Sequence, residues 1–135
     1  MDEPRPVPAI PSSTEHDLIY LLTDNIFFSS KIAQNLKANS VEAQTLTKPE
    51  ALAAAMETAA PDAVLVNLNA RGYDPMAVIQ TLKASEQSPT VIAFCGHSDT
   101  ETMEKGRQSG ADRVVANSAI TMNAAGVLRD AGIPV

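Results

Sequence analysis

After residue 16 the hydrophobic positions of the chain follow two alternating patterns. Apolar runs at residues 17–23, 63–68 and 90–95, with a shorter one within residues 112–117, predict strands of a parallel sheet that is buried on both faces. Residues 41–46 instead alternate apolar and polar side chains, which indicates a strand at the edge of that sheet. The segments between the strands have apolar residues at helical spacing, and residues 27–37 show this most clearly with Phe28, Ile32 and Leu36.

Local signals predict where two of the helices begin. Thr47 and Glu50 have the spacing of a capping box, and Pro49 suits the first turn of the same helix. Ser98 and Glu101 have the same spacing before the helix predicted at residues 99–110. The residues expected on the buried helix faces are Leu52, Ala55, Met56 and Ala59, then Val78, Ile79 and Leu82 after a start at Asp74-Pro75, and finally Ile120, Ala124, Val127 and Leu128.

Two helices have weaker patterns. The helix at residues 99–110 has Met103 as its only large apolar residue. In the last helix Gly126 weakens the middle, because glycine has a poor helix propensity.

Five strands that alternate with five helices predict an α/β fold in which a parallel sheet is covered on both faces. Because the second strand belongs at an edge and crossovers are right-handed, the expected strand order is 2-1-3-4-5. This is the doubly wound, flavodoxin-like solution, in which functional residues lie at the carboxyl ends of strands 1, 3 and 4.

Composition and charge limit the class of protein. A length of 135 residues, 44% hydrophobic and 19% charged, suits one globular domain. The net charge of -6 and the scattered basic residues argue against a nucleic-acid partner. The single cysteine favours a reducing compartment, and neither a membrane-spanning run nor a leader pattern is visible, so we expect a cytoplasmic protein.

The first sixteen residues differ from the rest of the chain. They contain four prolines without periodicity, at Pro4, Pro6, Pro8 and Pro11. We expect a flexible tail at residues 1–16 and a domain at residues 17–135. The proline spacing also leaves open a partner that reads polyproline.

Three segments resemble response-regulator receiver domains. They are "PDAVLVNLNARG" at residues 61–72, "VIAFCGHSD" at residues 91–99 and "SGADRVVANS" at residues 109–118, in the order and spacing of that family. The resemblance implies a (βα)5 fold and a role in two-component signal transduction. It also implies a chemistry, in which an aspartate after strand 3 takes a phosphoryl group with help from Mg²⁺, an acidic pair, a hydroxyl, a lysine and a mobile aromatic residue.

At these family positions the sequence has Asn67 for the acceptor, Thr23 and Asp24 for the acidic pair, Cys95 for the hydroxyl, Asn117 for the lysine and Val114 for the aromatic residue. Only Asp24 keeps the residue type of the family, and a cap or turn role before the first helix explains it equally well. A carboxamide has no anionic oxygen to attack phosphorus, and one carboxylate makes a poor Mg²⁺ site. We therefore expect no catalytic residue, no metal and no cofactor in this vestigial phosphorylation pocket.

The sequence thus favours a pseudo-receiver, an atypical receiver domain that acts without phosphorylation as a protein–protein interaction module. By resemblance, a protein partner or a homodimer would use one surface of the domain. It is formed by the fourth helix, predicted at residues 99–110, the fifth strand, predicted at residues 112–117, and the fifth and last helix. The residues expected there are Met103, Glu104, Arg107, Gln108 and Arg113. The same charges would also suit a solvated helix face.

Three alternatives stay open. The vestigial pocket could serve a small-molecule sensor or an enzyme. Cys95 could be a reactive thiol next to His97, although a strand-end cysteine more often acts as a small hydrophobic residue. The chain could also be the front piece of a larger regulator.

Overall fold

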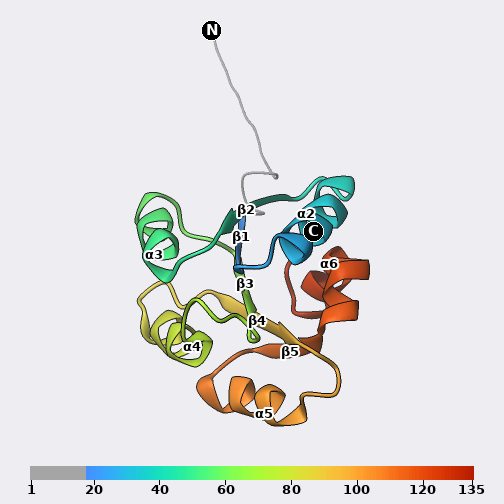
Figure 1. The fold of residues 1–135 in the computed structure, drawn as a ribbon. Coiled ribbons are helices and arrows are strands. Elements are labelled where there is room, and N and C mark those ends of the chain that lie inside the picture. The colour runs from blue at the N-terminus through green and yellow to red at the C-terminus, as the bar shows by residue number, and fades with distance from the viewer. Residues whose placement is uncertain (1–17) are drawn as a thin grey trace, which may run out of the picture.

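The computed structural model describes residues 18–135, in which a helix follows every strand of a five-stranded sheet (Figure 1). The strands are β1 (Leu18–Leu22), β2 (Glu42–Leu46), β3 (Ala63–Asn67), β4 (Thr90–Cys95) and β5 (Arg113–Ala116). The helices are α2 (Ile26–Ala38), α3 (Pro49–Thr58), α4 (Pro75–Ala84), α5 (Thr100–Ser109) and α6 (Asn117–Asp130). The predicted tail at residues 1–16 lies outside the described residues.

The sheet has the predicted order β2-β1-β3-β4-β5, and all neighbouring strands are parallel. Leu22 at the end of β1 is in register with Leu46 of β2 and Val66 of β3. Asn67, the last residue of β3, is in register with Phe94 of β4. The carboxyl ends of β1, β3 and β4 therefore lie side by side, which is where this kind of fold carries its functional residues.

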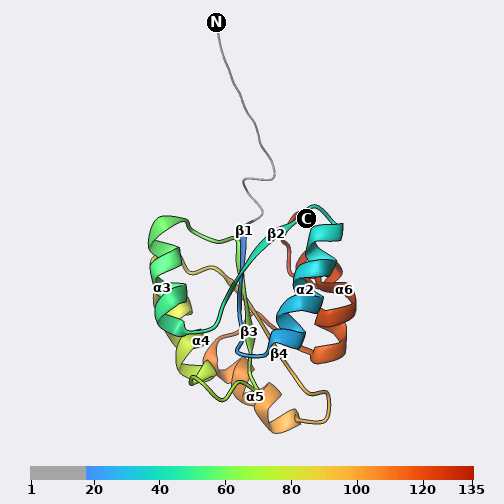
Figure 2. The same cartoon turned by 45° about the horizontal axis from the view of Figure 1, so that its top comes forward.

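The helices form one layer on each side of the sheet, with α2 and α6 on one face and α3, α4 and α5 on the other (Figures 1 and 2). The inner strands β1, β3 and β4 are apolar along almost their whole length because alternate side chains enter different layers. In β1, Ile19 and Leu21 belong to the α2–α6 layer, whereas Tyr20 and Leu22 belong to the other layer. Each such buried side chain contributes about 1.5–3 kcal/mol to folding.

The structure corrects both predicted capping boxes. Lys48, not Thr47, precedes α3, and it makes no side-chain capping bond. The reason is Pro49, which occupies the first helical position and keeps the residue before it extended. At α5 the cap is Asp99, one residue after Ser98, and its carboxylate accepts a hydrogen bond from the Thr102 amide.

The predicted buried faces are mostly confirmed. Leu52, Met56, Val78, Ile79, Leu82, Ile120, Ala124 and Leu128 are buried. Ala55 and Val127 are partly buried. Ala59 is wrong, because α3 ends at Thr58 and Ala59 is an exposed residue with extended backbone.

The last helix is broken at Asn123, whose backbone is not helical (φ -151°, ψ 58°). The Asn123 side chain caps the second half by accepting a hydrogen bond from the Gly126 amide (3.1 Å). Asn35 of α2 bridges the break, since its Nδ2 donates to the Met122 carbonyl (3.1 Å) and its Oδ1 accepts from the Ala125 amide (3.1 Å). The sequence predicted a weak point at Gly126, and the structure shows that the helix is interrupted three residues earlier, at Asn123.

Helix α5 lies against the sheet through a glycine. Gly106 is its only buried residue, and a Cβ atom there would lie 2.8 Å from Leu68 Cδ1 and 3.4 Å from Val114 Cγ2. The absence of a side chain lets a helix with little apolar surface approach the sheet closely. Met103, the large apolar residue that the sequence offered for this contact, is partly buried in the same layer.

Candidate functional site

The candidate site is a cavity of about 440 Å³ at the carboxyl ends of β1 and β3. Its lining residues are Asp24, Asn25, Ile26, Phe28, Asn67, Asn69 and Arg71. Two of the six pocket residues expected from the sequence, Asp24 and Asn67, thus line one cavity. Thr23 is not among the lining residues, but its Oγ1 accepts a hydrogen bond from the Asn67 side chain.

Thr23 and Asn67 form a buried polar pair, with 1% and 2% of their surfaces exposed. The side-chain amide of Asn67 donates from Nδ2 to Thr23 Oγ1 (3.0 Å). Its Oδ1 accepts a hydrogen bond from the backbone N–H of Asn69 (2.9 Å). Thr23 Oγ1 also accepts a hydrogen bond from the Asn25 amide (3.1 Å). Both ends of the carboxamide are therefore satisfied within the protein, as a buried polar group requires.

Asp24 ties two loops together. Its Oδ2 accepts hydrogen bonds from the backbone amides of Arg71 (3.1 Å) and Gly72 (3.0 Å), in the loop between β3 and α4. The cap of α2 is Asn25, whose Oδ1 accepts from the Phe27 and Phe28 amides. Asp24 is thus not the helix cap that the sequence allowed.

Asn69 links the same loop to the end of β4. Its Oδ1 accepts a hydrogen bond from the Gly96 amide (2.9 Å), and its Nδ2 donates to Asp99 Oδ2 (3.2 Å). Hydrogen bonds from the Thr102 side chain and amide, together with the one from Asn69, hold the pKa of Asp99 below its usual value. Asp99 therefore stays a charged cap of α5.

Tyr73 joins the ends of β1 and β3, the two strands at which the site lies. Its hydroxyl lies within hydrogen-bond distance of the carbonyl oxygens of Leu22 (3.0 Å) and Asn67 (3.1 Å). Burial, followed by the nearby charge of Asp24, raises the pKa of Tyr73 above its ordinary value. The phenol is therefore a neutral donor that fixes the ends of β1 and β3.

Cys95 is fully buried at the end of β4, and its sulfur lies 3.9 Å from the Asp99 carbonyl oxygen. Burial and the charge of Asp99 raise the pKa of the thiol, while Arg107 has a smaller opposite effect. Because the thiolate is the reactive form, this environment disfavours a nucleophilic or redox role. His97 is exposed.

The remaining two pocket positions lie on β5 and at the start of α6. Val114 is partly buried in the layer that contains α5. Asn117 is the first residue of α6, and its Oδ1 is buried without a hydrogen-bond partner among residues 18–135. Neither residue lines the cavity at Asp24 and Asn67.

The site does not suit Mg²⁺, the ion that the family resemblance implies. Among the described residues that line the cavity, Asp24 is the only carboxylate, and its Oδ2 already accepts two amide hydrogen bonds. Between residues 18 and 135 no group of three His, Cys, Asp or Glu side chains could hold a metal ion. A hard divalent cation needs more oxygen ligands and more charge than this.

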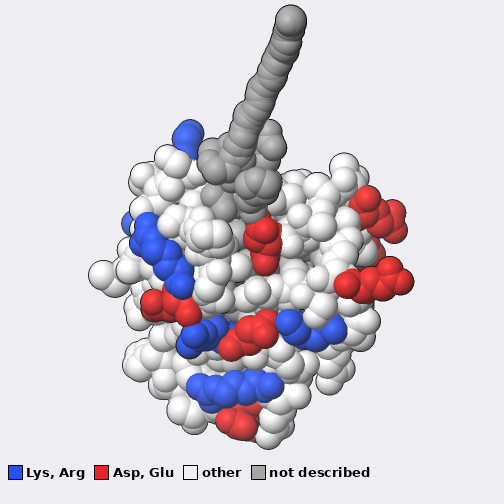
Figure 3. All heavy atoms as spheres, turned by 180° about the vertical axis from the view of Figure 1, so that it is seen from behind, with Lys and Arg blue, Asp and Glu red and all other residues white. Residues whose placement is uncertain are grey.

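The residues expected on the partner surface lie on α5 and at the start of β5. Glu104 is exposed and pairs with Arg107 (3.3 Å) and Gln108 (3.4 Å) on the same helix. Arg113 donates to the Asp130 carbonyl (2.7 Å) at the end of α6. Figure 3 shows basic and acidic side chains interspersed on the face it displays, without a continuous basic area of the kind that binds nucleic acid.

The sequence missed four residues that organise the site, namely Asn25, Asn69, Tyr73 and Asp99. Asn25 and Asp99 carry a usable signal, since both are good N-cap types close to the start of a predicted helix. Asn69 and Tyr73 carry none, because each bonds a residue far away in the chain: Asn69 bonds the loop after β4, and Tyr73 bonds the end of β1.

The fold and the position of the site define a doubly wound α/β protein of the receiver type. The family described as "Response regulator receiver domain" matches residues 19–119, and the chain belongs to this family. The family is one of two-component signalling. No curated protein matches the chain. None of the helices within residues 18–135 has the length and apolar content needed to cross a bilayer.

Solved structures share the fold at low sequence identity. The chain is similar to chemotaxis response regulator CheY4 of Vibrio cholerae (13% identity, TM-score 0.74, 84% of this chain and 97% of that one). It is also similar to the signal receiver domain of an HD domain-containing protein from Pseudomonas fluorescens Pf-5 (15%, 0.76, 90% of each chain). NtrX from Brucella abortus is 20% identical with a TM-score of 0.73, over 84% of this chain but only 28% of NtrX.

Proposed function

We propose that this protein is a phosphorylation-independent receiver domain, a pseudo-receiver that acts as a protein-interaction module and not as an enzyme. The observation that carries the proposal is Asn67. It stands at the end of β3, where the family resemblance puts the phospho-acceptor, and both ends of its amide are hydrogen-bonded within the protein. An amide that is engaged in this way has no anionic oxygen for attack on phosphorus.

The residues at the other family positions also argue against phosphorylation. Thr23 brings no charge for a metal ion, Asn117 brings no cation for a phosphoryl group, and Val114 has no ring to move. A phosphoryl group needs such electrostatic partners to be transferred and held. The single cysteine, which is buried and free, favours action in a reducing compartment such as the cytoplasm.

Intact mass after incubation with acetyl phosphate and Mg²⁺ tests the proposal. We expect no added phosphoryl group, whereas an ordinary receiver domain treated in parallel gains one. A rescue series sharpens the test: Asn67→Asp alone should label weakly, and Thr23→Asp with Asn117→Lys in addition should label measurably better. Stable labelling of the natural sequence would show that the pocket still works, and equal labelling of both variants would mean that the pocket is wrongly assigned.

The partner surface in this proposal is formed by α5, β5 and the outer side of α6, and it takes a protein partner or a second copy. Met103, Glu104, Arg107, Gln108 and Arg113 would contribute to it. A pull-down with the full chain identifies the partner, and charge reversal at Arg107 or Arg113 should weaken its capture. Asn67→Ala should leave capture unchanged wherever the variant is folded. Loss of capture in folded Asn67→Ala would contradict a role independent of the pocket.

The second candidate is a small-molecule sensor. The cavity of about 440 Å³ supports it, because its size falls in the range of ligand sites and its lining includes Asp24, Asn69 and Arg71. Amide chemical-shift changes at these residues during titration with nucleotides and small metabolites would favour this candidate over an interaction module.

A further inference from the structure

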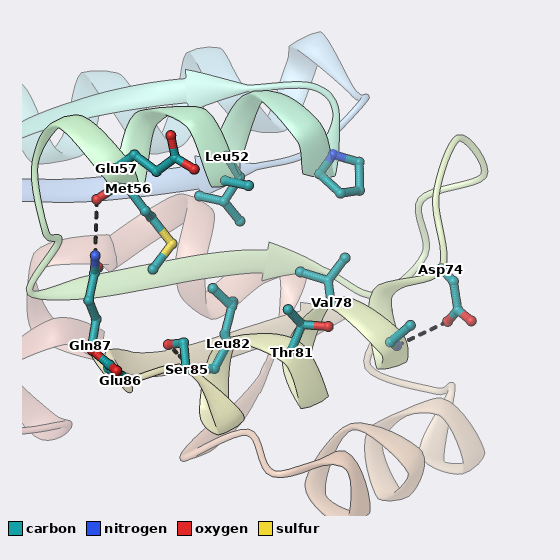
Figure 4. Close-up of a pocket in the computed structure, with 13 residues that line it drawn as sticks. Leu52, Met56, Glu57, Asp74, Val78, Thr81, Leu82, Ser85, Glu86 and Gln87 are labelled. Atoms are coloured by element: carbon teal, nitrogen blue, oxygen red, sulfur yellow. Dashed lines mark hydrogen bonds between the residues drawn. The ribbon is translucent and has the colours of Figure 1, made fainter.

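Helices α3 and α4 leave a groove between them on their face of the sheet. Helix α4 packs on α5, and α2 packs on α6, but α3 and α4 do not form a comparably packed pair. The groove has a volume of about 530 Å³. The Gln87 side chain bridges it at one end by donating to the Met56 carbonyl (3.0 Å). Figure 4 shows the side chains of both helices directed into this space.

The floor of the groove is apolar and its walls are low. Leu52 and Met56 of α3 face Val78 and Leu82 of α4 across the space (Figure 4). The other apolar lining residues are Pro49, Ala53 and Ala77. Ala53 and Ala77 are exposed and small, so a helix could approach closely over them. The two helices have ten residues each and therefore run for about 15 Å.

The charged side chains that line the groove are acidic. Among the residues that the structure describes, its lining includes Glu57, Asp74 and Glu86 but no lysine or arginine. Lys83 of α4 does not contribute, because its ammonium group is bonded to Asp112 (2.8 Å) and to the Pro89 carbonyl (3.0 Å). Asp74 is also engaged, as the N-cap of α4. Within residues 18–135, Glu57 and Glu86 are thus the lining carboxylates that no hydrogen bond or ion pair engages.

These two carboxylates lie at one end of the groove. Glu57 is next to the last residue of α3, and Glu86 follows the end of α4 (Figure 4). Both helices follow strands of the same parallel sheet, so their carboxyl ends, which carry partial negative charge, also meet there. The opposite end has Pro49 and Asp74, whose carboxylate caps α4. The groove therefore favours a ligand that is apolar along its length and positive at one end.

We propose that the α3–α4 groove binds a short amphipathic helix of a partner protein, with apolar residues on the floor and lysine or arginine toward Glu57 and Glu86. A helix laid over two parallel helices is a common way to fill such a groove, with anchors at i, i+4 and i+7. This surface lies on the other side of α4 from α5. It is separate from the α5–β5–α6 surface and does not depend on whether Asn67 accepts phosphate.

A titration of the full ¹⁵N-labelled chain tests the inference. The probe is a synthetic helical peptide of about four turns, with leucines at i, i+4 and i+7 and lysines in its last turn. We expect saturable amide shifts confined to α3, α4 and Gln87. A peptide with glutamates in place of the lysines, and one with the same residues in scrambled order, should bind at least about tenfold more weakly.

Two groove variants and two control variants make the result specific. Glu57→Gln with Glu86→Gln should weaken binding by about three- to tenfold and reduce its salt dependence, whereas Glu42→Gln, at an exposed position of the edge strand, should not. Ala53→Trp, also at an exposed position, should fill the groove and abolish the shifts. Arg107→Glu on the other surface should have no effect, which separates this inference from the proposed function.

Several results would overturn it. These are equal binding of the glutamate peptide, shifts located on α5 or at the pocket, or binding unchanged in both groove variants. Concentration-dependent shifts of the same residues without peptide would assign the groove to a second copy instead. Saturation by a small apolar compound without any peptide binding would assign it to a small ligand.

Discussion

Replacing Asn67 by aspartate should make the stability of this protein depend on pH in a defined way. The side chain is buried, and Asn67→Asp puts a carboxylate where an amide now donates to Thr23 Oγ1 (3.0 Å) and accepts from the Asn69 amide (2.9 Å). The Asn69 bond can persist, and the Thr23 hydroxyl can turn its own hydrogen toward the new oxygen. Burial and the Asp24 carboxylate, which lines the same cavity, oppose ionisation.

The balance sets the size of the effect. If burial and Asp24 outweigh the two hydrogen bonds by one to two pKa units, at about 1.4 kcal/mol per unit, the variant loses on the order of 1–3 kcal/mol at neutral pH. The folded-state pKa then lies above the unfolded value of about 3.9. The folded state binds more protons between the two values, so its stability falls as pH rises through roughly pH 4–6 and is constant above. Below that window the protonated acid resembles the amide, and the difference should vanish.

Urea unfolding of both proteins between about pH 3 and pH 8 measures this difference, and subtraction removes the carboxylates that they share. Gln80→Glu is the matched control, because it makes the same change from amide to acid at an exposed position of α4. It should stay within about 0.5 kcal/mol of the natural protein at every pH. A flat difference for Asn67→Asp, or a variant that gains relative stability as pH rises, would refute the proposed burial and charge balance.

Three further changes test individual contacts. Asn35→Ala removes both bonds across the break in α6 and should cost about 1–3 kcal/mol in urea unfolding, while Gln34→Ala on the exposed side of the same helix should cost less than about 0.5 kcal/mol. Gly106→Val places a side chain against Leu68 and should destabilise the protein by about 1–3 kcal/mol, with amide shifts strongest in α5; unchanged stability would mean that α5 moves freely. The Cys95 thiol should react with a thiol reagent only at the rate of unfolding, because it is buried and its pKa is raised, and rapid labelling of the folded protein at neutral pH would contradict this.

The sequence predicted the strands and their order because those features depend on local apolar patterns. Runs such as residues 63–68 can be satisfied only by a sheet that is covered on both faces, and the alternation at residues 41–46 requires an edge. Helix starts were less reliable. At α3 the motif Thr47–Glu50 was outweighed by the backbone restriction that Pro49 imposes on Lys48.

The break in α6 could not be predicted locally. Asn123 leaves the helix because Asn35, far away in the chain, satisfies the backbone groups on both sides of the break. The same reason hid the roles of Asn69 and Tyr73, whose hydrogen bonds join different strand ends. A propensity scale contains no information about partners at such separations.

The hydrogen bonds of the pocket affect how any mutation there must be interpreted. Asp24 joins the loop after β1 to the loop after β3, and Asn69 joins the latter to the end of β4. In a receiver that holds a phosphoryl group, polar groups in this region must be available to a ligand, whereas here Asn67 is satisfied from within. The polar residues of this pocket therefore hold the loops after β1, β3 and β4 in place, and the surrounding surfaces depend on these loops. A pocket variant could bind its partner differently because a signal is lost or because these loops are no longer held in place. Only a stability measurement on the same variant separates the two causes.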